Sequence, residues 1–433
     1  SLGFVVGIIS TVAGYSIYFR LTNRDISRYQ NSYPEPPHLA KSIAPGRRGI
    51  DLEEIRQRKK LWRVDTYLTA AFRPRLVRSV AHYDTHLLHS ILRQNHLNAL
   101  SVQLGSVLLL IILGGLGEYA AFRIPAGASL FIMASVLVAL TGAITYWFHA
   151  WRITIFILLL VLLNFITRYD LLSHTNKAYG MNYSSHTIYS TEQLRHICQP
   201  DTIAIHKQQT KEILSNWKAK NVTHTKSLPK LIIFAVSGGG LKAATWTMQV
   251  IQRLDELTDG KAMRQTALIT GASGGMLGAA YWRELYLRSQ GQIPQGAYIT
   301  DIGKDLLNAV AFTLVSNDIF LPYASFEAGN QRFYKDRVFM FERQLNENTH
   351  YLLHKKLSDY RIPEQRADIP LLFLTPSIVD DARRLVISPQ GVSYMMTAPV
   401  GMEKNGIVGI DAVDFRGLFR GQQADSLHFT TGA

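Results

Sequence analysis

Two short segments, LIIFAVSGGGLK at residues 231–242 and ALITGASGGMLG at residues 267–278, decide the predicted fold. Each begins with a run of apolar residues, which is typical of a buried parallel strand. Each run is followed at once by a glycine-rich turn and then by a stretch with helical periodicity. The sequence therefore predicts two successive strand–turn–helix units, which are the building blocks of an α/β fold with a parallel sheet.

The first turn contains three consecutive glycines, Gly238, Gly239 and Gly240. Without side chains, the backbone can come close to a ligand and direct successive N–H groups at it. The N-terminus of the following helix also favours negative charge. This arrangement suits either a phosphate group or the oxyanion of a tetrahedral intermediate.

The second turn, at residues 271–275, matches the pattern G-x-S-x-G. The flanking glycines Gly271 and Gly275 permit a sharp turn that raises the hydroxyl of Ser273 above the edge of the sheet. A G-x-S-x-G match alone is a weak signal. Here it lies between a strand and a helix, and a triglycine turn precedes it at the end of another strand. We therefore expect Ser273 to be a catalytic nucleophile.

Together the two motifs resemble those of the patatin-like phospholipase family. That family pairs a D-G-G-G-x-[RK]-G oxyanion loop with a G-x-S-x-G serine on the next strand–helix unit. The resemblance covers about residues 228–433 and implies a three-layer α/β/α hydrolase domain. It assigns Gly238, Gly239 and Gly240 to the oxyanion hole, Lys242 to the basic position and Ser273 to the nucleophile.

The chain departs from the family pattern at two positions. Ser237 replaces the leading aspartate and Ala243 replaces the final glycine of the loop, but neither change removes a backbone N–H donor. The family takes its base from an aspartate in a later D-G-G or D-G-A motif, and neither motif occurs in these residues. We therefore expect the catalytic aspartate beyond Ala433. The resemblance implies hydrolysis of fatty-acyl esters of phospholipids or lysophospholipids by a Ser–Asp dyad, with no metal or cofactor.

Two other interpretations remain open. The segment ALITGASGG also resembles the opening of short-chain dehydrogenases, whose T-G-x-x-x-G-x-G motif binds a dinucleotide. Gly271 and Gly275 match that motif, and Tyr351 and Lys355 supply a Y-x-x-x-K pair, but Leu277 stands where the last glycine belongs. The third interpretation is a membrane scaffold that carries an inactive hydrolase domain.

The rest of the chain contains four apolar stretches without a central charge, at residues 2–19, 97–116, 124–148 and 153–167. About 20 apolar residues cross the hydrocarbon core of a membrane as a helix. The first three stretches are long enough. The fourth is shorter, and it requires Arg152 and Arg168 at its ends to extend their side chains towards the membrane surfaces.

These stretches predict a domain organisation: a transmembrane helix at residues 1–19, a basic helical loop at 20–96, a three-helix transmembrane region at 97–169 and the hydrolase domain at 170–433. The expected location is a bacterial inner membrane. Three spans between the loop and the hydrolase place these two on opposite sides. The distribution of arginine and lysine slightly favours a hydrolase on the outer side, whereas the resemblance implies a cytoplasmic one, so the side stays open.

The composition is basic, with 46 Lys+Arg against 32 Asp+Glu and a formal net charge of +14. Because much of this charge adjoins the apolar stretches, we expect contact with anionic phospholipid rather than nucleic acid. A single cysteine, Cys198, excludes an intrachain disulfide framework. His82, His86 and His89 share one helical face, but packing histidines explain this spacing better than a metal site does. The sequence makes no prediction of oligomeric state.

Overall fold

The computed structural model describes residues 2–22, 66–68, 73–76, 85–168, 177–222, 228–292, 294, 296–319, 324–328, 331–398 and 409–432. The protein is a mixed α/β protein, and the chain divides into two compact units, Ser1–Leu109 and Leu110–Ala433. Most of the predicted basic loop at residues 20–96, including His82, lies outside the described residues.

The first unit contains helix α1 (Leu2–Thr22) and a short antiparallel hairpin of β1 (Thr66–Leu68) and β2 (Pro74–Leu76). Helix α4 (Thr85–Gly115) begins in this unit and ends in the second.

Two helices are long and apolar enough to cross a membrane. They are the stretch Arg93–Gly115 within α4, and α5 (Ala126–Phe148). Only 11% of the residues in each apolar window are buried within the protein, whereas the core helix of a soluble domain would be mostly buried. Shorter apolar helical stretches occur at Val5–Tyr18 in α1 and at Arg152–Ile166 in α6 (Arg152–Arg168).

The second unit is built on a parallel sheet with strand order β3-β4-β7. Strands β3 (Ile232–Val236) and β4 (Thr266–Gly271) confirm the two strands expected from the sequence, and β7 is Leu371–Leu374. In the register Val236 pairs with Gly271, and Gly271 pairs with Leu374. The carboxyl ends of all three strands therefore lie at the same edge of the sheet.

Two further strands extend this region. A single antiparallel bridge between Leu374 and Ile387 joins the end of β7 to the chain just after β8 (Arg384–Val386). Strand β8 pairs in parallel with β9 (Ala412–Asp414).

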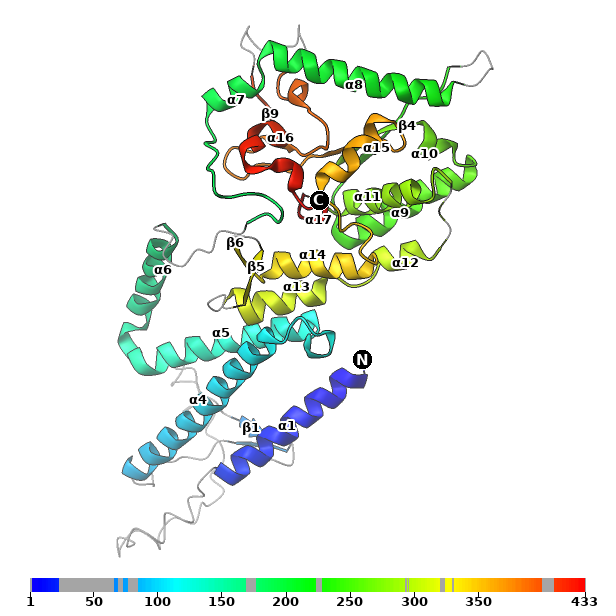
Figure 1. Ribbon diagram of the computed structural model, residues 1–433. Coiled ribbons are helices and arrows are strands. Elements are labelled where there is room, and N and C mark those ends of the chain that lie inside the picture. The colour runs from blue at the N-terminus through cyan, green and yellow to red at the C-terminus, as the bar shows by residue number, and fades with distance from the viewer. Residues whose placement is uncertain are drawn as a thin grey trace, which may run out of the picture. The chain divides into compact units, whose positions relative to one another are not determined.

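Helices cover both faces of the parallel sheet. The side chains of β7 show this, since they alternate between two hydrophobic clusters on opposite faces. Leu372 and Leu374 belong to the larger core with helices α9 (Gly240–Leu257) and α11 (Ser273–Arg288). Leu371 and Phe373 instead pack with Ile213 of α8 (Pro200–Asn221) on the other face. Figure 1 shows α9 and α11 side by side, with α8 separate from them.

Further helical elements of the second unit lie between residues 298 and 348. They are α12 (Tyr298–Ile302), α13 (Leu307–Thr313), the π-helical turn η3 (Leu314–Asp318) and α14 (Arg337–Asn348). A hairpin of β5 (Ser325–Ala328) and β6 (Gln331–Tyr334) precedes α14. Near the sheet lie α7 (Thr191–Ile197), α10 (Lys261–Gln265), α15 (Arg361–Gln365), α16 (Phe415–Leu418) and α17 (Phe429–Gly432).

Candidate active site

Ser273 lies where strand β4 turns into helix α11, as the sequence predicts. It is the first residue of α11 and is exposed to solvent. Its φ of 63° falls in the left-handed region, which is rare for a residue other than glycine. Gly271, at the end of β4, has a φ of 149°. These dihedral angles produce the sharp strand-to-helix turn that presents a nucleophilic serine in hydrolases of the α/β type.

The triglycine turn after β3 is brought against this serine. Gly239 and Gly240 have φ values of 143° and 61°, so a side chain at either position would strain the backbone. A Cβ atom added at Gly238 would lie 3.2 Å from the Cβ of Ser273 and 3.4 Å from its Oγ. The structure thus unites the two motifs that the sequence analysis paired.

The two turns also touch through their backbones. A Cβ atom at Gly275 would lie 2.3 Å from the carbonyl oxygen of Ser237, and one at Gly274 would lie 1.9 Å from that of Gly240. No real side chain fits such spaces. The N-termini of α9 and α11 are therefore held close together beside Ser273.

Neither of these helices has an N-cap residue that can close its N-terminus with a side-chain hydrogen bond. The N-cap residues are Gly239 for α9 and Ala272 for α11, and neither makes a side-chain capping hydrogen bond. The first N–H groups of a helix have no acceptor within the helix. Both helix dipoles therefore favour a negatively charged group beside Ser273, where such N–H groups could bind it.

Thr375 fixes the end of strand β4 from the neighbouring strand. Its backbone N–H and its hydroxyl both donate to the carbonyl oxygen of Gly271, at 2.8 and 3.0 Å. Thr375 directly follows β7, so it sits at the same edge of the sheet as Ser273. This role of Thr375 was not predicted from the sequence. The available signal was a polar residue immediately after the apolar run LLFL.

The base that would activate Ser273 is not found among the described residues. There, the Oγ of Ser273 has no hydrogen-bond partner. Lys242 is exposed and makes no ion pair within that part of the chain. The expected catalytic aspartate beyond Ala433 stays a prediction.

The tyrosine–lysine pair of the dehydrogenase interpretation lies away from the glycine turn. Lys355 Nζ pairs with Glu284 Oε1 at 2.6 Å. Glu284 is eleven residues along α11 from Ser273, which corresponds to about 16 Å of helix. Tyr351 lies in the turn before Lys355 and is 55% exposed. This placement gives the dehydrogenase interpretation no support.

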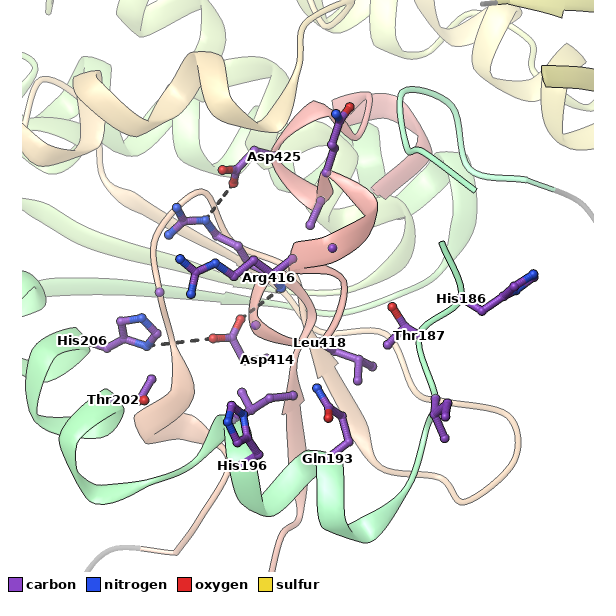
Figure 2. Close-up of a pocket in the computed structure, with 18 of the residues that line it drawn as sticks. His186, Thr187, Gln193, His196, Thr202, His206, Asp414, Arg416, Leu418 and Asp425 are labelled. Carbon is purple, nitrogen blue, oxygen red and sulfur yellow. Dashed lines mark hydrogen bonds and ion pairs between the residues drawn. The ribbon is translucent and has the colours of Figure 1, made fainter. Parts of the chain in front are cut away.

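A cavity of about 790 Å³ lies elsewhere in the second unit, and Ser273 does not line it. Figure 2 shows His206 of α8 and Asp414 of β9 facing one another within it. The Nδ1 atom of His206 accepts a hydrogen bond from the backbone N–H of Ser393 at 3.3 Å and lies 2.8 Å from its Oγ. Asp414 Oδ2 is 4.0 Å from the same nitrogen.

This Ser–His–Asp grouping is not a catalytic triad. A triad requires the serine and the carboxylate to contact opposite nitrogens of the imidazole, and here both approach Nδ1. Burial lowers the pKa of His206, which favours the neutral ring. Asp414 instead caps the N-terminus of α16 by accepting from Arg416 N. The grouping therefore has a structural explanation.

Within the described ranges, no group of three or more histidine, cysteine, aspartate or glutamate side chains is placed to hold a metal ion. Of the histidines that share one predicted helical face, His86 and His89 lie in α4, whereas His82 is outside the described residues.

Comparisons of the chain with models of protein families, with curated proteins and with solved structures find no match.

Proposed function

We propose that the protein is a membrane-anchored serine acyl hydrolase that cleaves fatty-acyl esters of phospholipids or lysophospholipids. The observation that carries this proposal is the position of Ser273. It occupies a left-handed turn, it touches the triglycine loop, and two uncapped helix N-termini lie beside it. A strained, exposed serine next to backbone N–H donors is an arrangement that covalent acyl transfer requires.

The chemistry follows from this geometry. The Oγ of Ser273 attacks the ester carbonyl carbon while its proton passes to a base, and the carbonyl oxygen becomes an oxyanion. Backbone N–H groups of the glycine loop and of the start of α11 stabilise that oxyanion, and one such donor contributes about 3 kcal/mol in comparable sites. The ester C–O bond then breaks, the alcohol leaves with a proton, and an acyl-enzyme remains. Water, deprotonated by the same base, hydrolyses the acyl-enzyme and restores Ser273.

The patatin-like resemblance makes an aspartate the expected base and a three-layer α/β/α domain the expected fold. The packing of helices on both faces of the β3-β4-β7 sheet supports that layered fold. The position of Ser273 at the carboxyl edge of a parallel sheet also supports the proposal, because ligands of such folds bind at that edge.

The exposed apolar helices support a lipid as substrate. Helices α5 and α6 present large apolar side chains outwards, among them Phe131, Val138, Ile153 and Leu160, which are 65–73% exposed. A surface of this kind needs a lipid environment or a partner. An anchor in the bilayer would hold Ser273 beside acyl esters that are themselves confined to the bilayer.

Labelling of the detergent-solubilised chain with a fluorophosphonate probe tests the proposal. The unmodified protein should react with the probe and hydrolyse lysophospholipid, and Ser273→Ala should lose both activities. Ser289→Ala is a matched control, because Ser289 follows the opposite end of the same helix. Labelling that survives in Ser273→Ala would refute the assignment. A folded protein that neither labels nor hydrolyses would indicate an inactive scaffold.

A further inference from the structure

The turn between helices α4 and α5, residues 116–125, is bound by charged side chains to the part of the second unit that carries Ser273, residues 177–432, which we call the catalytic unit. Glu118 accepts hydrogen bonds from Lys335 and from Arg343, the latter at 2.9 Å. Hydrogen bonds from these two cations lower the pKa of Glu118 despite its partial burial. Arg123 donates to Gln344 of α14 at 2.5 Å. The turn is thus attached at two points around α14.

Arg123 also closes the turn on itself. Its guanidinium donates to the carbonyl oxygens of Gly117 and Glu118, at 2.8 and 3.0 Å, and lies 3.5 Å from Glu347. Its side chain is only 9% exposed, so this network is not a mobile surface ion pair.

Apolar packing joins the same parts. Phe312 of α13 and Val315 of η3 are at most 1% exposed and form one cluster with Leu110 of α4. A Cβ atom at Gly114 would lie only 2.8 Å from the Cβ of Ser316, so the end of α4 comes into direct contact with η3.

The start of α5 is held as well, because the Ala126 N–H donates to Asn308 Oδ1 at 2.7 Å. Figure 1 shows the end of α4 and the start of α5 beside α13 and α14. Both helices therefore end or begin at the surface of the catalytic unit.

The chain must then leave this surface and return to it. It leaves along α5, whose later residues are mostly exposed and apolar. It has returned by Met181, which is 7% exposed within the main core of the catalytic unit. Between these points the chain contains a turn, η2 (His149–Trp151), and helix α6. If α5 crosses a membrane, α6 must cross it in the opposite direction.

Helix α6 has the properties that a second crossing needs. It has 17 residues, or about 25 Å of helix, slightly less than the hydrocarbon thickness of about 30 Å. Local thinning of the bilayer and the extended side chains of Arg152 and Arg168 can accommodate that difference. Its central residues Ile157, Leu160 and Leu163 are all more than half exposed.

We propose that α5 and α6 form a transmembrane hairpin, which places the turn at residues 116–125 on the same membrane face as Ser273 and the η2 turn on the opposite face. The proposal rests on the membrane anchoring in the proposed function but not on the hydrolase chemistry. It also makes the short fourth apolar stretch a true span.

Single-cysteine labelling in sealed membrane vesicles tests this topology. In a Cys198→Ser background, separate variants carry Tyr119→Cys in the turn, Trp151→Cys in η2 and Ile362→Cys in α15, all at positions at least 57% exposed. A membrane-impermeant maleimide is applied before and after permeabilisation. Tyr119→Cys and Ile362→Cys should be labelled from the same side of the membrane, and Trp151→Cys should be labelled from the opposite side.

Either of two results would overturn the hairpin: identical labelling of all three positions, or labelling of the Tyr119 and Ile362 positions from different sides. Fluorophosphonate labelling of the same variants reports the hydrolase separately. If the three cysteines are labelled from the expected sides but the variants do not react with the fluorophosphonate, the result counts against the proposed chemistry and leaves the hairpin intact.

Discussion

The carbonyl oxygen of Gly271 accepts two hydrogen bonds from Thr375, one from the backbone N–H at 2.8 Å and one from the hydroxyl at 3.0 Å. Thr375 thereby fixes the strand end from which the serine turn begins. Thr375→Val keeps the shape and the backbone bond but removes the hydroxyl. A hydrogen bond of this kind contributes about 1 kcal/mol. We therefore expect the rate of fluorophosphonate labelling to fall by about fivefold.

Thr375→Ser provides the matched control, because it restores the hydroxyl without the methyl group. It should regain most of the labelling rate, and the KM for lysophospholipid should change little in either variant. Equal rates for the valine and serine variants would show that the hydroxyl does not position Ser273.

Gly238→Ala should impair the site without disturbing the fold. The new methyl group would lie 3.2 Å from Ser273 Cβ, an atom that side-chain rotation does not move, and 3.4 Å from Oγ, so the triglycine turn and the serine turn would have to move apart by a few tenths of an ångström. Gly238 does not have a positive φ, so the alanine adds no backbone strain. We expect labelling to slow by at least about tenfold while the melting temperature stays nearly constant. Gly421→Ala is the control, since its nearest neighbour would be 3.9 Å away, and it should label normally.

The ion pair between Arg283 and Glu364 should be essential for stability. Both side chains are at most 1% exposed, and Glu364 also accepts hydrogen bonds from Gln390 and Leu372 N. Glu364→Ala leaves a buried guanidinium without its partner, which costs about 3–5 kcal/mol. Chemical denaturation would measure this loss.

An exposed pair provides the comparison for that measurement. Arg253 and Glu256 lie 3.2 Å apart, with side chains 67% and 37% exposed. Glu256→Ala should lower the free energy of unfolding by less than about 1 kcal/mol. Similar losses in the two variants would mean that the buried pair contributes no more than a surface pair.

Glu342 should make stability fall as pH rises. Burial raises its pKa from 4.5 to about 7, and one of its carboxyl oxygens, Oε1, has no hydrogen-bond partner among the described residues. The folded state therefore holds the proton more tightly than the unfolded state does. The resulting stability is fully present below about pH 4.5 and is lost as the pH approaches 7, with a total change on the order of 3 kcal/mol. Unfolding measured from pH 5 to pH 8 should reveal this slope.

Glu342→Gln removes the titrating group but keeps the shape and a donor–acceptor pair. The slope between pH 5 and 7 should become shallower in this variant, and the variant should be more stable than the unmodified protein at pH 8. A slope that persists unchanged would assign the pH dependence to other groups.

The central part of the candidate site could be predicted from the sequence because its signals are local. The apolar runs at residues 231–236 and 267–270 correspond to β3 and β4, and the glycines that follow them dictate the turns. The sequence pattern that specifies a strand–turn–helix unit lies within about a dozen consecutive residues.

Thr375 and Glu118 could not be found in this way. The role of Thr375 depends on β7 pairing beside β4, although more than 100 residues separate Thr375 from Gly271. Glu118 belongs to a turn whose partners, Lys335 and Arg343, lie more than 200 residues away. Neither residue has a local pattern that distinguishes it from an ordinary polar residue, because only the tertiary fold creates its contacts.

The left-handed conformation of Ser273 has a consequence for how such a protein can decay. A serine in this region stores about 1 kcal/mol of backbone strain that a glycine would not. The substitution Ser273→Gly would therefore remove the proposed nucleophile and stabilise the chain at the same time. Because this substitution costs no folding stability, we expect only selection for the reactivity of Ser273 to retain the serine.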